Sequence, residues 1–160
     1  MSTFTAVHVA LSLAGIASGA IVLFGFLTGR RFDTWNGIFL ATTILTSVTG
    51  FGFPFERLLP SHVVGALSLL VLALALFARY LRHLAAGWHR AYVIAAVTAL
   101  YFNVFVLVVQ LFLKVPALNA LAPTQAEPPF AIAQLAVLVA FVGLGAVAVK
   151  RAGAGTRPPV

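Results

Sequence analysis

Charge is what this sequence has least of. Among its 160 residues only three are acidic, and charged residues make up 8% of the chain. Soluble domains carry about 25% charged residues, and a fold with far fewer would expose apolar surface on every side and aggregate. The scarcity of charge therefore excludes a soluble globular protein. A content of 62% hydrophobic residues and a mean hydropathy of +1.08 favour the lipid bilayer as the surrounding solvent.

Cysteine is absent altogether, which excludes disulfide bonds and thiolate chemistry. Acidic residues are so few that the net charge is +7. A basic balance can indicate nucleic-acid binding, but here the Lys and Arg residues form no run or stripe. They stand at the ends of apolar segments, which is typical of the signals that set membrane topology. We therefore expect no nucleic-acid partner.

What the sequence does contain is five apolar stretches, and each predicts a membrane-spanning helix. A helix needs about 20 residues to cross the hydrocarbon core; the second stretch is the shortest and is rich in threonine. Apolar runs without period-2 alternation exclude a membrane β-barrel. The expected fold is an all-α integral membrane bundle, one domain over residues 1–151 with a disordered cytoplasmic tail at 152–160. The five predicted spans are residues 4–27, 35–51, 61–81, 91–113 and 130–149.

The basic residues predict which end of each helix faces the cytoplasm, because cytoplasmic loops are enriched in Lys and Arg. With the N-terminus outside and the C-terminus in the cytoplasm, the outer side holds Arg57 and Lys114. The cytoplasmic side then holds Arg30, Arg31, Arg79, Arg82, Arg90, Lys150, Arg151 and Arg157. Every predicted loop agrees with this alternation.

Glycines recur at helical spacing in the first predicted span. Gly15 and Gly19 are four residues apart, and so are Gly25 and Gly29. Pairs of small residues at this spacing let membrane helices approach one another closely. We therefore expect both pairs to lie at helix–helix contacts.

Hydroxyl groups follow one face of the second predicted span, at Thr42, Thr46 and Thr49. A threonine hydroxyl in a helix can donate to the backbone carbonyl three or four residues earlier. These side chains therefore need no ligand, and we expect them to serve helix packing.

The remaining polar side chains gather toward the predicted outer side, which favours an outward-facing binding site. A polar side chain within a span is expected to face protein or a water-filled cavity. For Asn103, near mid-membrane, an interhelical hydrogen bond is the favoured role. On the cytoplasmic side, His83 and His89 are expected to be solvated loop residues. The candidate ligand-binding residues are His8, Glu56, His62, Asn103, Gln110, Lys114, Glu127 and Gln134.

We expect this cluster to bind a lipid-soluble or amphipathic small molecule, such as a quinone or a lipid. An enzyme could use His8 or His62 as a general base with Glu127 orienting it, but no motif fixes a reaction. Three alternatives stay open. In the first, His8 and His62 ligate haem or a metal ion in a redox protein. In the second, the chain is an accessory or assembly subunit of a larger membrane complex, or forms a homo-oligomer. It could also be a small transporter, although no carboxylate lies within a span to relay protons.

Four stretches resemble a group of small multi-pass inner-membrane proteins of proteobacteria. They are residues 49–55 (TGFGFPF), 60–65 (PSHVVG), 100–110 (LYFNVFVLVVQ) and 122–130 (APTQAEPPF), so the similarity covers roughly residues 40–135. The resemblance implies a location in a bacterial inner membrane. It implies no particular activity or cofactor, and it assigns no functional residue.

Overall fold

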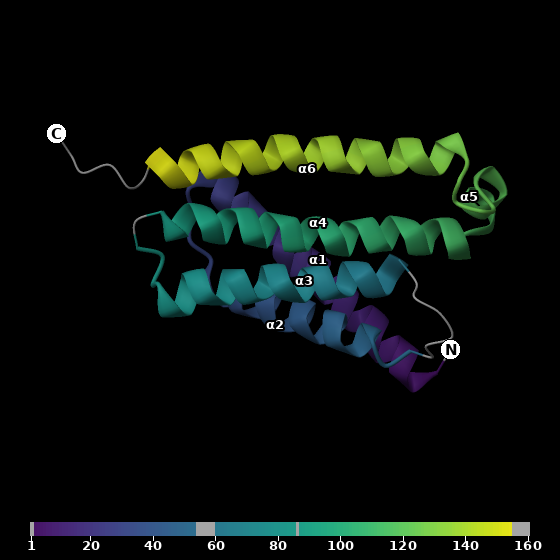
Figure 1. Ribbon diagram of the computed structural model, residues 1–160, viewed down its shortest axis with the longest axis horizontal. Helices are drawn as coiled ribbons and strands as arrows, with labels where there is room; N and C mark the ends of the chain where they lie inside the picture. Colours follow the sequence, from purple (N-terminus) through teal and green to yellow (C-terminus); the bar gives the residue numbers. More distant parts are fainter. Residues whose placement is uncertain (1, 54–59, 86, 155–160) are drawn as a thin grey trace.

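The computed structural model describes residues 2–53, 60–85 and 87–154, and the regular elements in these ranges are helices (Figure 1). They confirm the predicted all-α class. The elements are α1 (Thr3–Thr28), α2 (Asp33–Gly50), α3 (Pro60–Leu76), the π-helix η1 (Phe77–Leu81), α4 (Trp88–Lys114), α5 (Pro116–Leu121) and α6 (Pro128–Ala154).

Within the described ranges, four helical segments are long and apolar enough to cross a membrane: Thr3–Thr28, His62–Leu81, Trp88–Lys114 and Pro128–Gly153. The second predicted span is also a helix, but α2 has 18 residues and is the least apolar of the long helices, so it is outside this group. The loop predicted before the last span contains the short helix α5, which begins at a proline. Proline suits the first turn of a helix, where its missing N–H leaves no bond unmade.

Consecutive long helices run in opposite directions, so the bundle has two chemically different ends (Figure 1). The turn between α1 and α2, the loop between η1 and α4, and the C-terminal end of α6 lie together at one end. We call this the basic end, because it holds Arg30, Arg31, Arg79 and Arg151. The opposite end holds the N-terminus, the end of α2 and α5 (Figure 1).

The hydrophobic core occupies the half of the bundle nearer the basic end. Here α4 packs against α1, α3 and α6, and nearly every residue from Tyr92 to Leu100 is buried. Beyond this segment, residues 101–110 of α4 are all half-buried. The tightly packed half is therefore the one that carries the basic residues.

Gly19 lies where α1 crosses α2 and α4. A Cβ atom at this position would lie 2.6 Å from Cδ1 of Leu100 and 2.8 Å from Cε2 of Phe39. Both neighbouring side chains are buried. The close helix approach predicted from the first glycine pair is therefore confirmed at Gly19.

Asn103 joins two helices, as predicted. Its Nδ2 atom on α4 donates a hydrogen bond of 3.1 Å to Oγ1 of Thr43 on α2. Gly15 brings α1 against the same pair, since a Cβ there would lie 3.2 Å from the Thr43 hydroxyl and 3.3 Å from the Asn103 amide nitrogen. This polar contact thus holds three helices together in the middle of the bundle.

The second glycine pair is not a helix–helix contact, and that prediction is wrong. Gly29 has φ +73° and ends α1, where its N–H donates to the carbonyl of Gly25; a Cβ at Gly29 would meet nothing within 4 Å. Gly25 instead lies against Phe32 and the carbonyl of Arg30 in the turn that follows. A left-handed backbone conformation directly after the last helical turn favours glycine, because glycine has no Cβ atom to clash.

The hydroxyls of α2 mostly bond within their own helix. Thr42 and Thr49 each donate to the carbonyl four residues earlier at 2.7 Å, as predicted. Ser47 donates to the carbonyl of Thr43 at 2.9 Å. Thr46 is the exception, since its buried Oγ1 has no hydrogen-bond partner among the described residues.

Candidate functional site

Two of the predicted site residues, His8 and His62, lie at the opposite end and contact the same segment of the chain. Nδ1 of His8 is 2.8 Å from Oγ1 of Thr49, and its ring packs edge-on against Phe53 with 5.0 Å between centroids. His62 is buried, and its ring lies 6.0 Å from that of Phe51. The Thr49 hydroxyl also contacts the carbonyl of Leu45 in its own helix at 2.7 Å, and the tautomer of His8 sets which side chain donates in their hydrogen bond.

Three other predicted residues also lie toward the opposite end. Gln134 on α6 donates from Nε2 to the carbonyl of Phe105 at 3.2 Å, while its buried Oε1 has no partner among the described residues. Gln110 is half-buried on α4. Lys114, in the last turn of α4, is exposed and near enough to His8 for its charge to act on the ring.

Glu127 bonds within the turn that precedes α6. Its carboxylate accepts hydrogen bonds from the Thr124 hydroxyl at 2.9 Å and from the Ala126 N–H at 3.1 Å. Desolvation raises the pKa of Glu127, but these hydrogen bonds outweigh it and lower the pKa below its ordinary value. Its predicted role in orienting a histidine stays a prediction.

A metal site finds no support within the described ranges, which contain no group of three or more His, Asp or Glu side chains able to hold an ion. Glu56 was part of the predicted cluster, and it lies outside the described residues. An outward-facing site that includes Glu56 therefore stays a prediction.

A partly open cavity of about 410 Å³ lies at the basic end, bordered by α1, α2, η1, α4 and α6. Its basic lining comes from Arg30, Arg31, Arg79, Arg151, His83 and His89, and the one acid that faces it is Asp33. Phe26, Phe32 and Leu84 contribute half-buried apolar surface. The cavity thus combines a strongly basic rim with an apolar floor.

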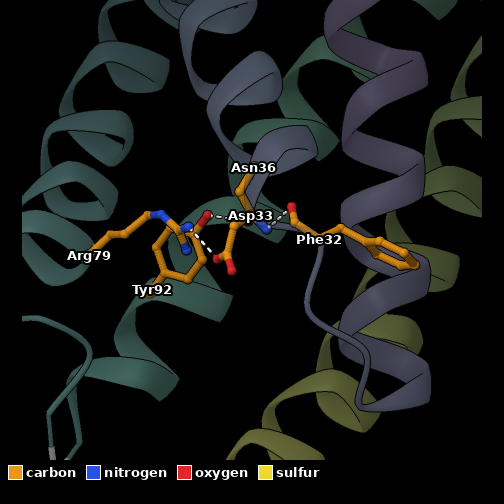
Figure 2. A network of polar contacts seen from close by, with 5 residues as sticks. All are labelled: Phe32, Asp33, Asn36, Arg79 and Tyr92. Carbon is orange, nitrogen blue, oxygen red and sulfur yellow. Dashed lines mark hydrogen bonds and ion pairs between the residues drawn. The ribbon is translucent and has the colours of Figure 1, made fainter.

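A hydrogen-bonded network crosses one wall of the cavity (Figure 2). Nη2 of Arg79, from η1, lies 2.7 Å from Oδ1 of Asp33 at the start of α2. The hydroxyl of Tyr92, from α4, donates to Oδ1 of Asn36, whose Nδ2 donates to the carbonyl of Phe32 at 2.8 Å. The Arg79 guanidinium also lies 5.5 Å from the centre of the Tyr92 ring. Three helical elements are therefore joined at this wall.

The network is buried on one side and open on the other. Tyr92 and Asn36 are buried, and the Arg79 side chain is 14% exposed, whereas that of Asp33 is 63% exposed. The hydrogen bond from Arg79 lowers the pKa of Asp33 below its ordinary value. Arg79 is thus a nearly buried cation whose counter-ion lies at the surface.

The segment that presents Arg79 has an unusual backbone. In η1 the N–H of Arg82 bonds to the carbonyl of Phe77 at 2.9 Å, five residues earlier. His83 and Leu84 follow with φ +48° and +56°, and both line the cavity. Non-glycine residues in this region cost roughly 1–3 kcal/mol each and cluster at functional sites, as π-helical turns often do. The irregular backbone therefore points to the same place as the cavity.

His89 and Arg90, at the start of α4, lie against the end of α6, and His89 lines the cavity. His89 hydrogen-bonds to the backbone of Ala152, and the Arg90 guanidinium packs against Gly153. Basic side chains are favoured at a helix C-terminus because of the helix dipole. The prediction that His89 is a solvated loop residue is wrong, since it is half-buried in α4; His83 is exposed in the loop, as predicted.

No protein-family model, curated protein or solved structure matches the chain. The geometry of the cavity is therefore the strongest guide to function. The sequence analysis explained the arginines of the cavity as topology signals alone. Asp33 and Asn36, however, are three residues apart in the first turn of α2 and therefore lie on one helix face. The sequence signal that could have indicated this site was Asp33, a rare acid in this chain, close to the Asn36 amide at the end that holds most of the basic residues.

Proposed function

We propose that this chain is a five-span membrane protein that binds an amphiphilic small molecule in the cavity at its basic end. The observation that carries the proposal is the lining, in which four arginines and two histidines surround one aspartate above an apolar floor. An anionic group would meet the arginines, and the apolar part of the same molecule would lie against Phe26, Phe32 and Leu84.

Position and charge both support an anionic amphiphile. Arg30, Arg31 and Arg151 are exposed and line the same cavity as the nearly buried Arg79, so a bound anion would be attracted by several positive charges at once. A volume of about 410 Å³ falls in the range of small-molecule sites. Basic pockets between membrane helices on the cytoplasmic side typically take anionic head groups.

The fifth span in this proposal is α2. Asp33, at its start, pairs with Arg79 at the basic end, and Thr49, near its finish, bonds to His8 at the opposite end. At 1.5 Å per residue its 18 residues cover roughly 27 Å, close to the hydrocarbon thickness. The hydroxyls of Thr42, Ser47 and Thr49 bond to carbonyls of their own helix, which lowers the cost of placing them in lipid.

The proposed orientation places the N-terminus outside and the basic end in the cytoplasm. The excess of Lys and Arg at this end supports that orientation. The resemblance to small inner-membrane proteins of proteobacteria supports a bacterial inner membrane as the location. A cytoplasmic basic end also places the cavity beside the leaflet whose surface is richest in anionic lipids.

The test is a comparison of ligands that share a chain and differ in head group. Purified protein in a neutral detergent is titrated with oleate, oleyl alcohol or oleylamine, and bound ligand is counted by native mass spectrometry. We expect one oleate per chain, bound at least about tenfold more tightly than the alcohol, because a hydrogen bond to a charged group contributes roughly 1.5–3 kcal/mol.

Arg79→Gln should weaken oleate binding by about tenfold or more, since it removes such a hydrogen bond. Lys150→Gln is the matched control, because Lys150 is exposed at the same end and does not line the cavity. Equal affinity for the three head groups, or an equal loss in both variants, would show that this cavity is not the binding site.

A further inference from the structure

We infer that the anionic group bound in this cavity is a lipid phosphate, and that it takes the Arg79 guanidinium from Asp33 when it binds. The inference rests on the proposed function and names the ligand class of the same cavity. Three observations support it: the number of charges in the lining, the arrangement of the donors, and the exposure of Asp33.

The charges in the lining call for more than one negative charge. Four arginines line the cavity, and once Asp33 has turned away they leave four positive charges there when the histidines are neutral. A fatty-acid carboxylate would leave three of these uncompensated. A phosphate monoester carries about −1.5 to −2 near neutral pH, so it compensates up to half of them.

The arginines that line the cavity belong to different elements of the fold. Arg30 and Arg31 follow α1, Arg79 lies on η1, and Arg151 lies near the end of α6. A guanidinium binds both carboxylates and phosphates through paired N–H groups. A phosphate group directs its oxygens tetrahedrally and can meet donors from several directions, whereas a carboxylate has two oxygens in one plane. The arrangement of donors therefore favours phosphate.

Asp33 has the properties of a replaceable counter-ion. It meets Arg79 through Oδ1, and its side chain is 63% exposed, so it can turn toward solvent. Arg79 is held more firmly, since it is only 14% exposed and lies beside the buried Tyr92 ring. Figure 2 shows the two side chains approaching from different elements. A phosphate that enters the cavity can replace the carboxylate while Arg79 keeps its position.

The source of the phosphate is a lipid, because the floor of the cavity is apolar and lies among helices apolar enough to cross a membrane. A free phosphate ion would leave the half-buried side chains of Phe26, Phe32 and Leu84 in contact with water. An acyl chain attached to the phosphate covers them.

The experiment uses the full-length protein, delipidated in neutral detergent, with dioleoyl phosphatidic acid, oleate, glycerol 3-phosphate and inorganic phosphate as probes. We expect phosphatidic acid to bind at least about tenfold more tightly than oleate, and both water-soluble phosphates to compete only weakly. Arg79→Lys keeps the charge but loses the paired N–H groups, so phosphatidic acid binding should weaken by about tenfold.

The Asp33→Asn variant distinguishes replacement of the Asp33 carboxylate by the phosphate from a purely structural role of Asp33. It removes the competing carboxylate, so phosphatidic acid should bind about threefold more tightly, which a misfolded variant could not do. Lys150→Gln should leave binding unchanged. Unchanged or weaker binding in Asp33→Asn would overturn the exchange.

The other outcomes distinguish this inference from the proposed function. Oleate binding as tightly as phosphatidic acid would overturn the phosphate assignment and leave the proposed function standing. If inorganic phosphate displaced phosphatidic acid at a concentration equal to that of the lipid, the assignment of the phosphate to a lipid would be overturned. A lack of any preference among charged and neutral head groups would overturn both proposals.

Discussion

Replacing Gly19 by alanine measures how closely three helices meet in the core. The added methyl group would lie 2.6 Å from Cδ1 of Leu100 and 2.8 Å from Cε2 of Phe39, closer than carbon atoms pack. Phe39 is 1% exposed and Leu100 3%, so neither side chain can move into solvent. Overpacking of this kind costs about 1–3 kcal/mol.

Helix propensity works in the other direction, because alanine is more favourable than glycine within a helix by roughly 0.5–1 kcal/mol. Gly143→Ala in α6 provides the control, since a Cβ there would meet nothing within 4 Å. Both variants gain the same helix propensity, so the difference between their free energies of unfolding measures the cost of overpacking at Gly19. We expect Gly19→Ala to be less stable than Gly143→Ala by about 1–3 kcal/mol.

The assay is reversible unfolding in mixed micelles, with sodium dodecyl sulfate as denaturant and far-UV circular dichroism as the signal. The free energy of unfolding is compared for the wild type and the two variants. A difference between the variants below about 0.5 kcal/mol, the scatter of ordinary surface substitutions, would refute the close three-helix contact.

Two further predictions concern Asp33 and the topology. Because Arg79 lowers the pKa of Asp33, their pairing should stabilise the fold fully at pH values above the unfolded-state pKa of about 3.9, and progressively less as the pH falls through the folded-state pKa. The Asp33→Asn variant should therefore lose up to ~1 kcal/mol of the free energy of unfolding at pH 6 and nothing in strong acid. A loss that does not depend on pH would contradict this. In the cysteine-free chain, single cysteines at Phe51 and Ala117 should react with an impermeant maleimide on intact cells while one at Thr34 stays protected; labelling of Thr34, or protection of Phe51, would contradict five spans.

The helices themselves could be predicted from the sequence, because apolar runs between charged residues mark where lipid ends. The first predicted span, residues 4–27, differs from α1 (Thr3–Thr28) by one residue at each end. The role of Gly29 could not be deduced from spacing, since a four-residue interval is the same for a packing pair and for a glycine that ends a helix. What separates the two is the backbone angle, and that depends on the turn that follows.

The cavity was harder to predict than the helices. Charge bias explains the arginines at the basic end without any site, so nothing in the sequence required them to converge. The direction in which Arg79 points depends on η1, where the hydrogen bonds skip one more residue than in an α-helix. A helical wheel with a fixed period of 3.6 residues cannot represent that change. By contrast, the Asn103 contact lies within regular helices and followed the prediction.

The π-turn in η1 is in effect a single residue added to an otherwise regular helix. One residue corresponds to a rotation of roughly 100° about a helix axis that has 3.6 residues per turn. The chain therefore leaves the helix at Leu81 in a direction rotated by that angle, and the loop with His83 and Leu84 starts from there, while α3 keeps its own apolar face. The apolar face of α3 and the cavity wall that follows it can consequently change independently of each other. A gain or loss of one residue between Phe77 and Leu81 would reorient the cavity wall while leaving the membrane anchor as it is.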